Sequence, residues 1–188
     1  MRYVHRAIIY KNAGRFFQAI DDYSKALDIE PDLSNVRYDL AQTLRKVKMY
    51  QPAVDEYLRA IELDPVKAEA YNNLGITYLD MKRYDDAIRC FRKVIEMDPK
   101  YTKAYNNLGG ALAETGKLDE ARAVLEKAIE IDPGYKYSYK NLAMVYIQEK
   151  KPAEAFDYMS RYLRLAPDDK SAEQILESLR VVLKGDSL

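Results

Sequence analysis

Few side chains in this sequence could perform covalent chemistry. Cys90 is the only cysteine and His5 the only histidine, so the chain offers neither a cysteine cluster nor a second histidine to bind a metal or relay a proton. As a nucleophile Cys90 would need a base, but it stands beside Phe91, and we expect a partly buried structural thiol. The sequence therefore predicts no metal site and no cofactor.

Three short motifs look like sites but lack part of the required chemistry. The acid pairs 21–22, 85–86 and 168–169 could hold a metal or a proton, but we expect them at helix starts, where acids favour the positive end of the helix dipole. The tail 185–188 spells Gly-Asp-Ser-Leu, a serine-esterase signature, without a nearby histidine. The pair 109–110 lacks the Gly-Lys-Ser/Thr of a phosphate loop. We expect no catalytic residue and no enzymatic activity.

One polar set has a spacing that suits recognition. Asn73, Asn107 and Asn141 lie 34 residues apart. An amide side chain offers both a hydrogen-bond donor and an acceptor, which is what a peptide bond needs. For these side chains to stand in a row, the elements that carry them must repeat with the same spacing.

Composition narrows the class of protein. The 188 residues include 30 basic and 30 acidic side chains, which give a net charge of zero. A balanced charge disfavours a general nucleic-acid binder and a membrane-surface protein. The apolar runs are far shorter than the roughly 20 residues of a membrane span, and the first ten residues do not resemble a signal peptide. We expect no membrane insertion and a cytoplasmic location.

The prolines reveal an internal repeat. Five of the seven lie 34 residues apart, which is typical of stacked-repeat proteins. Aligned on this period, the chain shows an alanine position, a large apolar position and a position of small residues. The members are Pro31, Pro65, Pro99, Pro133 and Pro167; Ala19, Ala53, Ala87, Ala121 and Ala155; Tyr23, Tyr57, Phe91, Leu125 and Met159; and Ala7, Ala41, Gly75, Gly109 and Ala143.

These positions resemble the tetratricopeptide repeat family. The third unit contains the whole family pattern, at Tyr71, Leu74, Gly75, Tyr78, Ala87, Phe91 and Pro99. The resemblance covers residues 1–167 and departs locally: Arg6 replaces a leucine, and Arg37 replaces an aromatic residue. It implies an all-α, right-handed superhelical α-solenoid of helix-turn-helix units, whose first helices line a concave groove.

The period divides the chain into repeats and a terminal helix. The predicted units are 1–33, 34–67, 68–101, 102–135 and 136–167. Residues 168–188 are expected to break the period. An apolar stripe there predicts a C-terminal capping helix over 168–184, with Ser171 and Gln174 as its capping box, and a tail over 185–188.

The resemblance also implies which residues face the groove. In some family members such an asparagine ladder holds an extended peptide, although asparagine is also common there without that role. Gly110 costs about 1 kcal/mol relative to alanine inside a helix, so either it forms a depression for an apolar side chain or it has drifted without selection. The predicted groove residues are Asn73, Asn107, Asn141, Asn72, Asn106, Lys103, Lys140, Ile76, Gly110 and Met144.

The leading functional prediction is a non-catalytic scaffold that binds a peptide or helical segment of a partner protein in this groove. One alternative is a regulatory or substrate-presenting module of a larger enzyme. Another is a self-assembling scaffold, in which the N-terminal unit lacks a cap and meets another copy. Only two residues match the family's clamp for acidic chaperone tails, Asn73 and Lys103, so that ligand is disfavoured.

Overall fold

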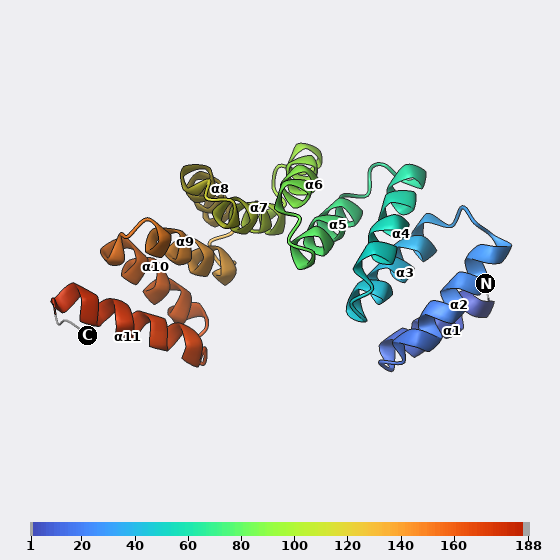
Figure 1. The fold of residues 1–188 in the computed structure, drawn as a ribbon, viewed down its shortest axis with the longest axis horizontal. Coiled ribbons are helices and arrows are strands. Elements are labelled where there is room, and N and C mark those ends of the chain that lie inside the picture. Colours follow the sequence, from blue (N-terminus) through green and yellow to red (C-terminus); the bar gives the residue numbers. More distant parts are fainter. Residues whose placement is uncertain (1, 186–188) are drawn as a thin grey trace. The chain divides into compact units, whose positions relative to one another are not determined.

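The structure is a computed structural model, which describes residues 2–185. Within this range every regular element is a helix, so the predicted all-α repeat fold is confirmed (Figure 1). The helices are α1 (Arg2–Asn12), α2 (Phe16–Ile29), α3 (Ser34–Lys46), α4 (Tyr50–Leu63), α5 (Ala68–Asp80), α6 (Tyr84–Met97), α7 (Thr102–Glu114), α8 (Leu118–Ile131), α9 (Lys136–Gln148), α10 (Pro152–Leu165) and α11 (Lys170–Lys184).

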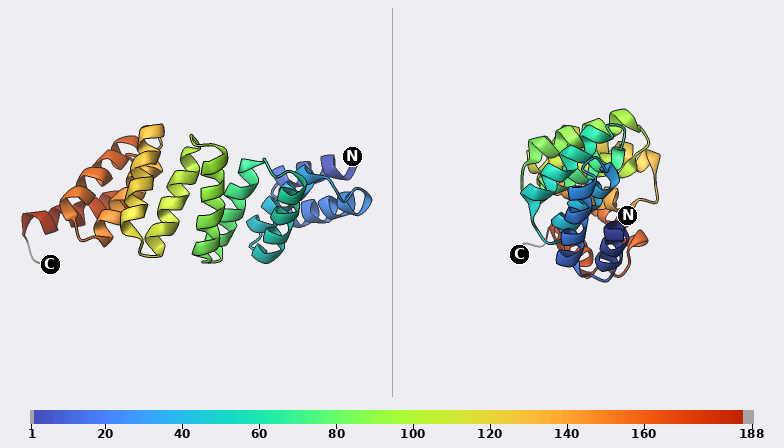
Figure 2. Two further views of the ribbon diagram at one scale, coloured as in Figure 1. Left: turned by 90° about the horizontal axis from the view of Figure 1, so that it is seen from above. Right: turned by 90° about the vertical axis from the view of Figure 1, so that its right-hand side faces the viewer.

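The chain forms two compact units, Met1–Pro99 and Lys100–Leu188. The first unit contains the hairpins α1/α2, α3/α4 and α5/α6, and the second contains α7/α8, α9/α10 and the single helix α11 (Figure 2). Within each unit the second helix of a hairpin packs against the first helix of the next, as α2 does on α3 and α10 on α11. The boundaries of the five predicted repeats remain a prediction.

The last helix corrects the expectation that the period ends at residue 167. First helices begin at Ser34, Ala68, Thr102 and Lys136, and α11 begins at Lys170, again 34 residues later. The helix also begins differently from the prediction, because Asp169 and not Ser171 is its N-cap: the Ala172 amide donates to Asp169 Oδ1 at 3.0 Å. Gly185 ends it in a left-handed conformation, and the other tail residues, 186–188, lie outside the described residues.

The turn inside every hairpin needs one residue with a positive φ. The same repeat position supplies it each time, with φ between 57° and 75°. Glycine adopts this conformation without steric cost, whereas other residues rarely do. The five residues are Gly14, Lys48, Lys82, Gly116 and Lys150. Backbone geometry, and not residue type, is therefore the constant feature of the turn.

The core lies between the two helices of each hairpin. The five aligned alanines of the second helices are fully buried, as are the large residues four positions later. A Cβ added to Gly75 would come within 2.6 Å of the Phe91 ring, and one added to Gly109 would overlap the Leu125 side chain. The small position of the first helix thus receives the large side chain of the second, and the two helices approach closely.

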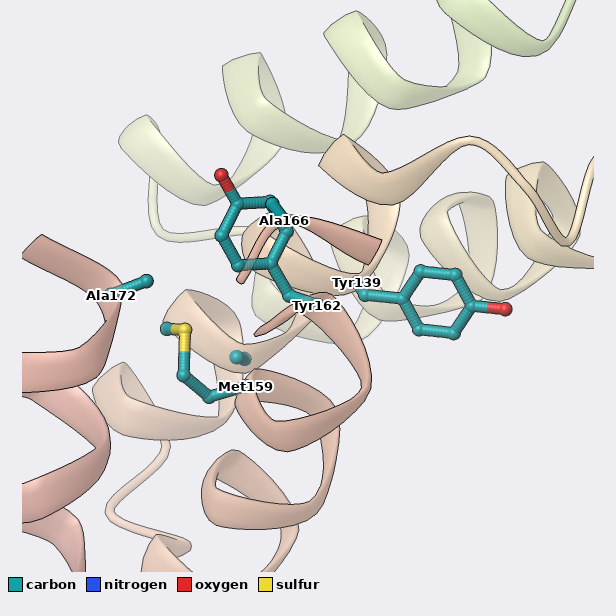
Figure 3. Packing of buried hydrophobic residues seen from close by; sticks show 6 residues of the cluster. Tyr139, Met159, Tyr162, Ala166 and Ala172 are labelled. Atoms are coloured by element: carbon teal, nitrogen blue, oxygen red, sulfur yellow. The ribbon is translucent and has the colours of Figure 1, made fainter. Parts of the chain in front are cut away.

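The C-terminal helix is joined to its neighbours by an apolar cluster. Tyr139 and Ala143 of α9, Met159 and Tyr162 of α10, and Ala172 of α11 belong to it (Figure 3). Each of these side chains is buried. The cluster fixes α11 on the last hairpin. No helix among residues 2–185 is long and apolar enough to cross a membrane.

Candidate functional site

In the first unit, Asn73 bonds to the neighbouring repeat. Its Nδ2 on α5 donates to Tyr38 Oη on α3 at 2.7 Å, and Gln42 Nε2 donates to the same hydroxyl at 2.8 Å. The amide of Asn73 therefore ties two first helices together. An amide has a second N–H and a carbonyl oxygen beyond this bond, so it keeps capacity for a ligand.

Asn73 also lines a cavity of about 300 Å³. The other lining residues are Lys11, Gln42, Thr43, Arg45 and Lys46, all of which lie on the first helices α1 and α3. Two of the cations are held by aspartates: Lys11 Nζ lies 2.8 Å from Asp39 Oδ1, and Arg45 Nε lies 2.8 Å from Asp80 Oδ2. The lining side chains are all polar or charged, and they come from three helices, α1, α3 and α5.

In the second unit the same register recurs. Asn141 Nδ2 on α9 donates to Asn106 Oδ1 on α7 at 3.0 Å, and Asn106 Nδ2 lies 3.4 Å from Asn107 Oδ1. Asn141 and Asn106 are 35 residues apart, as are Asn73 and Tyr38. Within each unit, the asparagine of one first helix thus bonds to the preceding first helix.

The remaining predicted groove residues differ in how exposed they are. Asn72 and Asn106 are only 6% exposed, so their side chains offer little surface to a peptide. A Cβ added to Gly110 would meet only Asn141 Nδ2, at 3.8 Å, which leaves open space beside it. The exposed side chains are Lys103 and Met144, and the half-buried one is Ile76. The predicted depression between Ile76 and Met144 stays a prediction, because these residues belong to different units.

Lys140 is engaged in holding α11 to the last hairpin. Its Nζ lies 3.0 Å from Asp169 Oδ2, and Tyr162 Oη donates to the same carboxylate at 2.7 Å. The hydrogen bond from Tyr162, with those from the Ala172 amide and Lys140, holds the pKa of Asp169 well below its usual range. The reciprocal bond raises the pKa of Tyr162 to about 12. Lys140 has a structural role that its predicted groove position did not indicate.

Sequence reasoning missed two ion pairs that explain the departures from the repeat pattern. Arg6 donates from Nε and Nη2 to Asp22, at 2.5 and 2.6 Å, and Arg37 Nη1 lies 2.7 Å from Glu56 Oε2. Asp22 therefore lies inside α2 as an ion-pair partner, and the predicted helix-start role of the pair 21–22 is wrong. Only a partial signal was present: Asp22 and Glu56 occupy the same repeat position, but the later repeats have no acid there.

The remaining candidates for reactive chemistry are enclosed or dispersed. Cys90 is buried, and burial raises the pKa of its thiol to about 12, so little thiolate forms at neutral pH. Among residues 2–185 no three histidine, cysteine, aspartate or glutamate side chains gather in a way that could hold a metal ion.

Comparison with known protein families supports the tetratricopeptide repeat assignment. Four family models described as tetratricopeptide or TPR repeats match residues 2–33, 49–82, 72–136 and 112–179. No curated protein sequence matches the chain significantly.

Solved structures show the same fold. The crystal structure of MamA is 25% identical, with a TM-score of 0.80, and the match covers 88% of this chain and 96% of that one. YrrB, described as a TPR protein with an unusual peptide-binding site, is 22% identical over 92% and 89% of the chains, with a TM-score of 0.76. PilF of Pseudomonas aeruginosa is 21% identical over 97% and 83%, with a TM-score of 0.82.

Proposed function

Because the chain belongs to the tetratricopeptide repeat family, we propose that it is a non-catalytic protein-interaction scaffold whose first helices bind an extended segment of a partner protein. Repeats of this family are generally protein-interaction modules. The first helices of each unit carry the amides, the cations and the open space that such a ligand would contact.

The observation that carries the proposal is the cavity of about 300 Å³ in the first unit. All of its lining residues come from first helices, and none of the second helices contributes. Its donors include the amides of Gln42 and Asn73 and the ammonium group of Lys46, whereas Lys11 and Arg45 are already paired with Asp39 and Asp80. Such groups suit the carbonyl oxygens of a peptide backbone and acceptor side chains.

In the second unit, Asn141 and the open space at Gly110 would form a contact set of their own. Asn141 holds the preceding repeat with one N–H, which leaves its second N–H and its carbonyl oxygen for a backbone amide. An apolar side chain of the ligand would lie beside Gly110, where only Asn141 approaches. Asn72 and Asn106 are left out of the proposed contact set because they are buried, and Lys140 because it holds Asp169.

Hydrogen bonds from the asparagines can supply only part of the binding free energy. Each neutral hydrogen bond contributes about 1 kcal/mol net, whereas micromolar binding needs about 8 kcal/mol. The amides therefore set the position of the backbone, and apolar and charged contacts must supply most of the affinity. Moderate affinity with modest sequence selectivity is the expected behaviour. The peptide-binding site named for YrrB makes this kind of ligand a reasonable one to test.

The test is capture of binding proteins from native lysate by the wild type and by Asn73→Ala/Asn107→Ala/Asn141→Ala. Partners lost with the triple variant identify the ligand of the first helices. Asn12→Ala, at the exposed end of α1, is the matched control and should retain every partner. Identical captures by the triple variant and the wild type would reject the proposal, once circular dichroism has shown that both are folded.

One observation favours self-assembly as a second candidate function. Ile9 of α1 is 64% exposed, although the equivalent residues are fully or almost fully buried. These are Thr43, Thr77, Ala111 and Val145. The exposed face would suit another copy of the chain. Light scattering over a concentration series should then show association that Ile9→Glu abolishes, and a monomer at all concentrations would exclude it.

A further inference from the structure

Helix α11 has the buried residues of a first helix. Ala172 and Leu179 of α11 are buried, as are Ala70 and Thr77 at the same repeat positions of α5. With its start at Lys170, α11 therefore occupies the place of the first helix of a sixth repeat. The structure contains no second helix after it among the described residues.

In the other repeats, the second helix packs on one face of the first helix. Numbered by the first unit, positions 3, 6, 7 and 10 of the first helix contact positions 22 and 23 of the second. Arg37 bonds to Glu56 (positions 3 and 22), Gly75 approaches Phe91 (positions 7 and 23), and Tyr146 stacks on Tyr158 with ring centres 5.4 Å apart (positions 10 and 22). In each hairpin the second helix packs on the first helix and covers part of this face.

In α11 the same face is open and charged. Its residues are Glu173, Leu176, Glu177 and Arg180, and all but Leu176 are exposed. Together with Leu163 and Arg164 of α10 they line a groove of about 380 Å³. Two leucines form an apolar strip in it, and the charged residues surround them. The groove lies where the second helix of a sixth repeat would pack.

The chain itself shows how a charge on this face is matched. Arg6 and Arg37 of the first two repeats each pair with an acid at position 22 of the second helix, Asp22 and Glu56. In α11, Glu173 stands at position 3, the place that Arg37 occupies, with the opposite sign. A helix seated in the groove should therefore carry a basic residue at the equivalent of position 22.

Size sets a second requirement on the occupant. Position 7 holds alanine or glycine in every hairpin, because the large residue at position 23 fills the space above it. Glu177 occupies that position in α11. A second helix like those of this chain would collide with it, which disfavours a hairpin from another copy. An occupant with a small residue at position 23 leaves room for the Glu177 side chain.

From these two requirements we propose that the α10/α11 groove binds an amphipathic helix of a partner protein, which carries a basic residue opposite Glu173 followed by alanine or glycine opposite Glu177. An apolar residue of this helix lies on Leu163 and Leu176. The surface is separate from the asparagine-bearing face of the first helices, so the two sites can act independently.

The probe is a set of fluorescein-labelled peptides with the sequence of α10, Pro152–Leu165, stapled on the face that points away from the groove so that they are helical. The test peptide carries Tyr158→Lys and Met159→Ala, the changes at positions 22 and 23. The unmodified peptide and an acidic control peptide, which carries Tyr158→Glu and Met159→Ala, are the controls. By fluorescence anisotropy the test peptide should bind at least about fivefold more tightly than either control, as expected for a partly exposed charge pair.

Variants of the full chain test the groove itself. Glu173→Lys should weaken the test peptide about fivefold and should bind the acidic control peptide more tightly instead. Glu154→Lys is the matched control, because Glu154 also lies in the first turn of a helix but not in the groove. It should bind like the wild type, as should Asn73→Ala/Asn141→Ala, whose effect belongs to the other site.

Three results would overturn the proposal: no binding by any of the peptides, equal or tighter binding by the unmodified peptide, or the same affinity for Glu173→Lys and Glu154→Lys. The first two would show that α11 is a solvated cap and nothing more. The third would show that the peptide binds elsewhere on the chain.

Discussion

The helix pairs of the first two repeats are held together differently from those of the third and fourth. In the first two, an arginine of the first helix bonds to an acid of the second, in the pairs Arg6–Asp22 and Arg37–Glu56. In the third and fourth, a glycine of the first helix receives Phe91 or Leu125 of the second.

The difference shows that the repeat fold accepts charge at this interface when both partners are present. Breaking a buried ion pair costs more than the pair contributes, because the remaining charge is left without a partner. An arginine at position 3 or 6 is thus tolerated where position 22 is an acid. The apolar interfaces carry no such condition, and they depend on close contact instead.

The largest expected effect is the loss of Phe91. Phe91 is fully buried against Gly75, and Phe91→Ala should lower the free energy of unfolding by about 3–5 kcal/mol, through lost burial and the cavity left behind. Urea denaturation followed by circular dichroism measures this. A loss below about 1 kcal/mol would mean that the third repeat does not depend on this contact.

The second prediction exchanges one kind of interface for the other. Arg37→Tyr leaves Glu56, whose side chain is 18% exposed, without its partner, and should cost about 3 kcal/mol. Arg37→Tyr/Glu56→Val installs the residues of the fourth repeat, Tyr105 and Val124, and should recover most of that loss.

The double variant shows whether Arg37 and Glu56 are coupled or contribute to stability independently. Recovery of stability means that the ion pair and the apolar pair are interchangeable. If the cost of Glu56→Val simply adds to that of Arg37→Tyr, the two side chains are not coupled, and the contrast between the repeats has another cause. Both outcomes can be read from urea midpoints of the four proteins.

The third prediction compares neighbouring glycines in α7. A Cβ at Gly109 overlaps Leu125, so Gly109→Ala should destabilise the chain by about 1–2 kcal/mol, although alanine favours the helix. A Cβ at Gly110 meets nothing closer than 3.8 Å, so Gly110→Ala should stabilise it by about 1 kcal/mol. Equal shifts in the urea midpoint would contradict this assignment of close contact to Gly109.

The sequence alone was sufficient for the helical repeat, because proline, alanine and small residues recur at fixed positions. It also separated Gly109, which belongs to the repeated position of small residues, from Gly110, which was predicted to face the groove. It was not sufficient for the ion pairs, since position 22 contains Asp22, Glu56, Cys90, Val124 and Tyr158 and shows no common residue type. Only the geometry shows that this position meets both Arg6 and Arg37.

The candidate site was predicted less completely for a related reason. Spacing alone predicted the asparagine row, but it could not show that Asn73 bonds to Tyr38 or that Asn106 is buried. Side-chain rotamers and neighbouring helices decide such contacts. Lys140 is the clearest case, because its partner Asp169 lies beyond the repeats from which its position was inferred.

The smallest expected effect concerns the pH dependence of the first interface. Asp22 is 1% exposed, but Arg6 is 41% exposed, and solvent screens its charge. The hydrogen bonds from Arg6 lower the pKa of Asp22 below its ordinary value, so the carboxylate stabilises the folded chain at neutral pH. This contribution is complete above the unfolded pKa of about 4 and is lost as the pH falls through the lower folded value.

The free energy of unfolding of the wild type, measured in urea, should therefore exceed that of Asp22→Asn by less and less between pH 5 and pH 2. Asp21→Asn, at an exposed residue beside Asp22, is the control and should show no comparable trend. A difference between the wild type and Asp22→Asn that stays constant down to pH 2 would mean that the ion pair does not couple this interface to protonation.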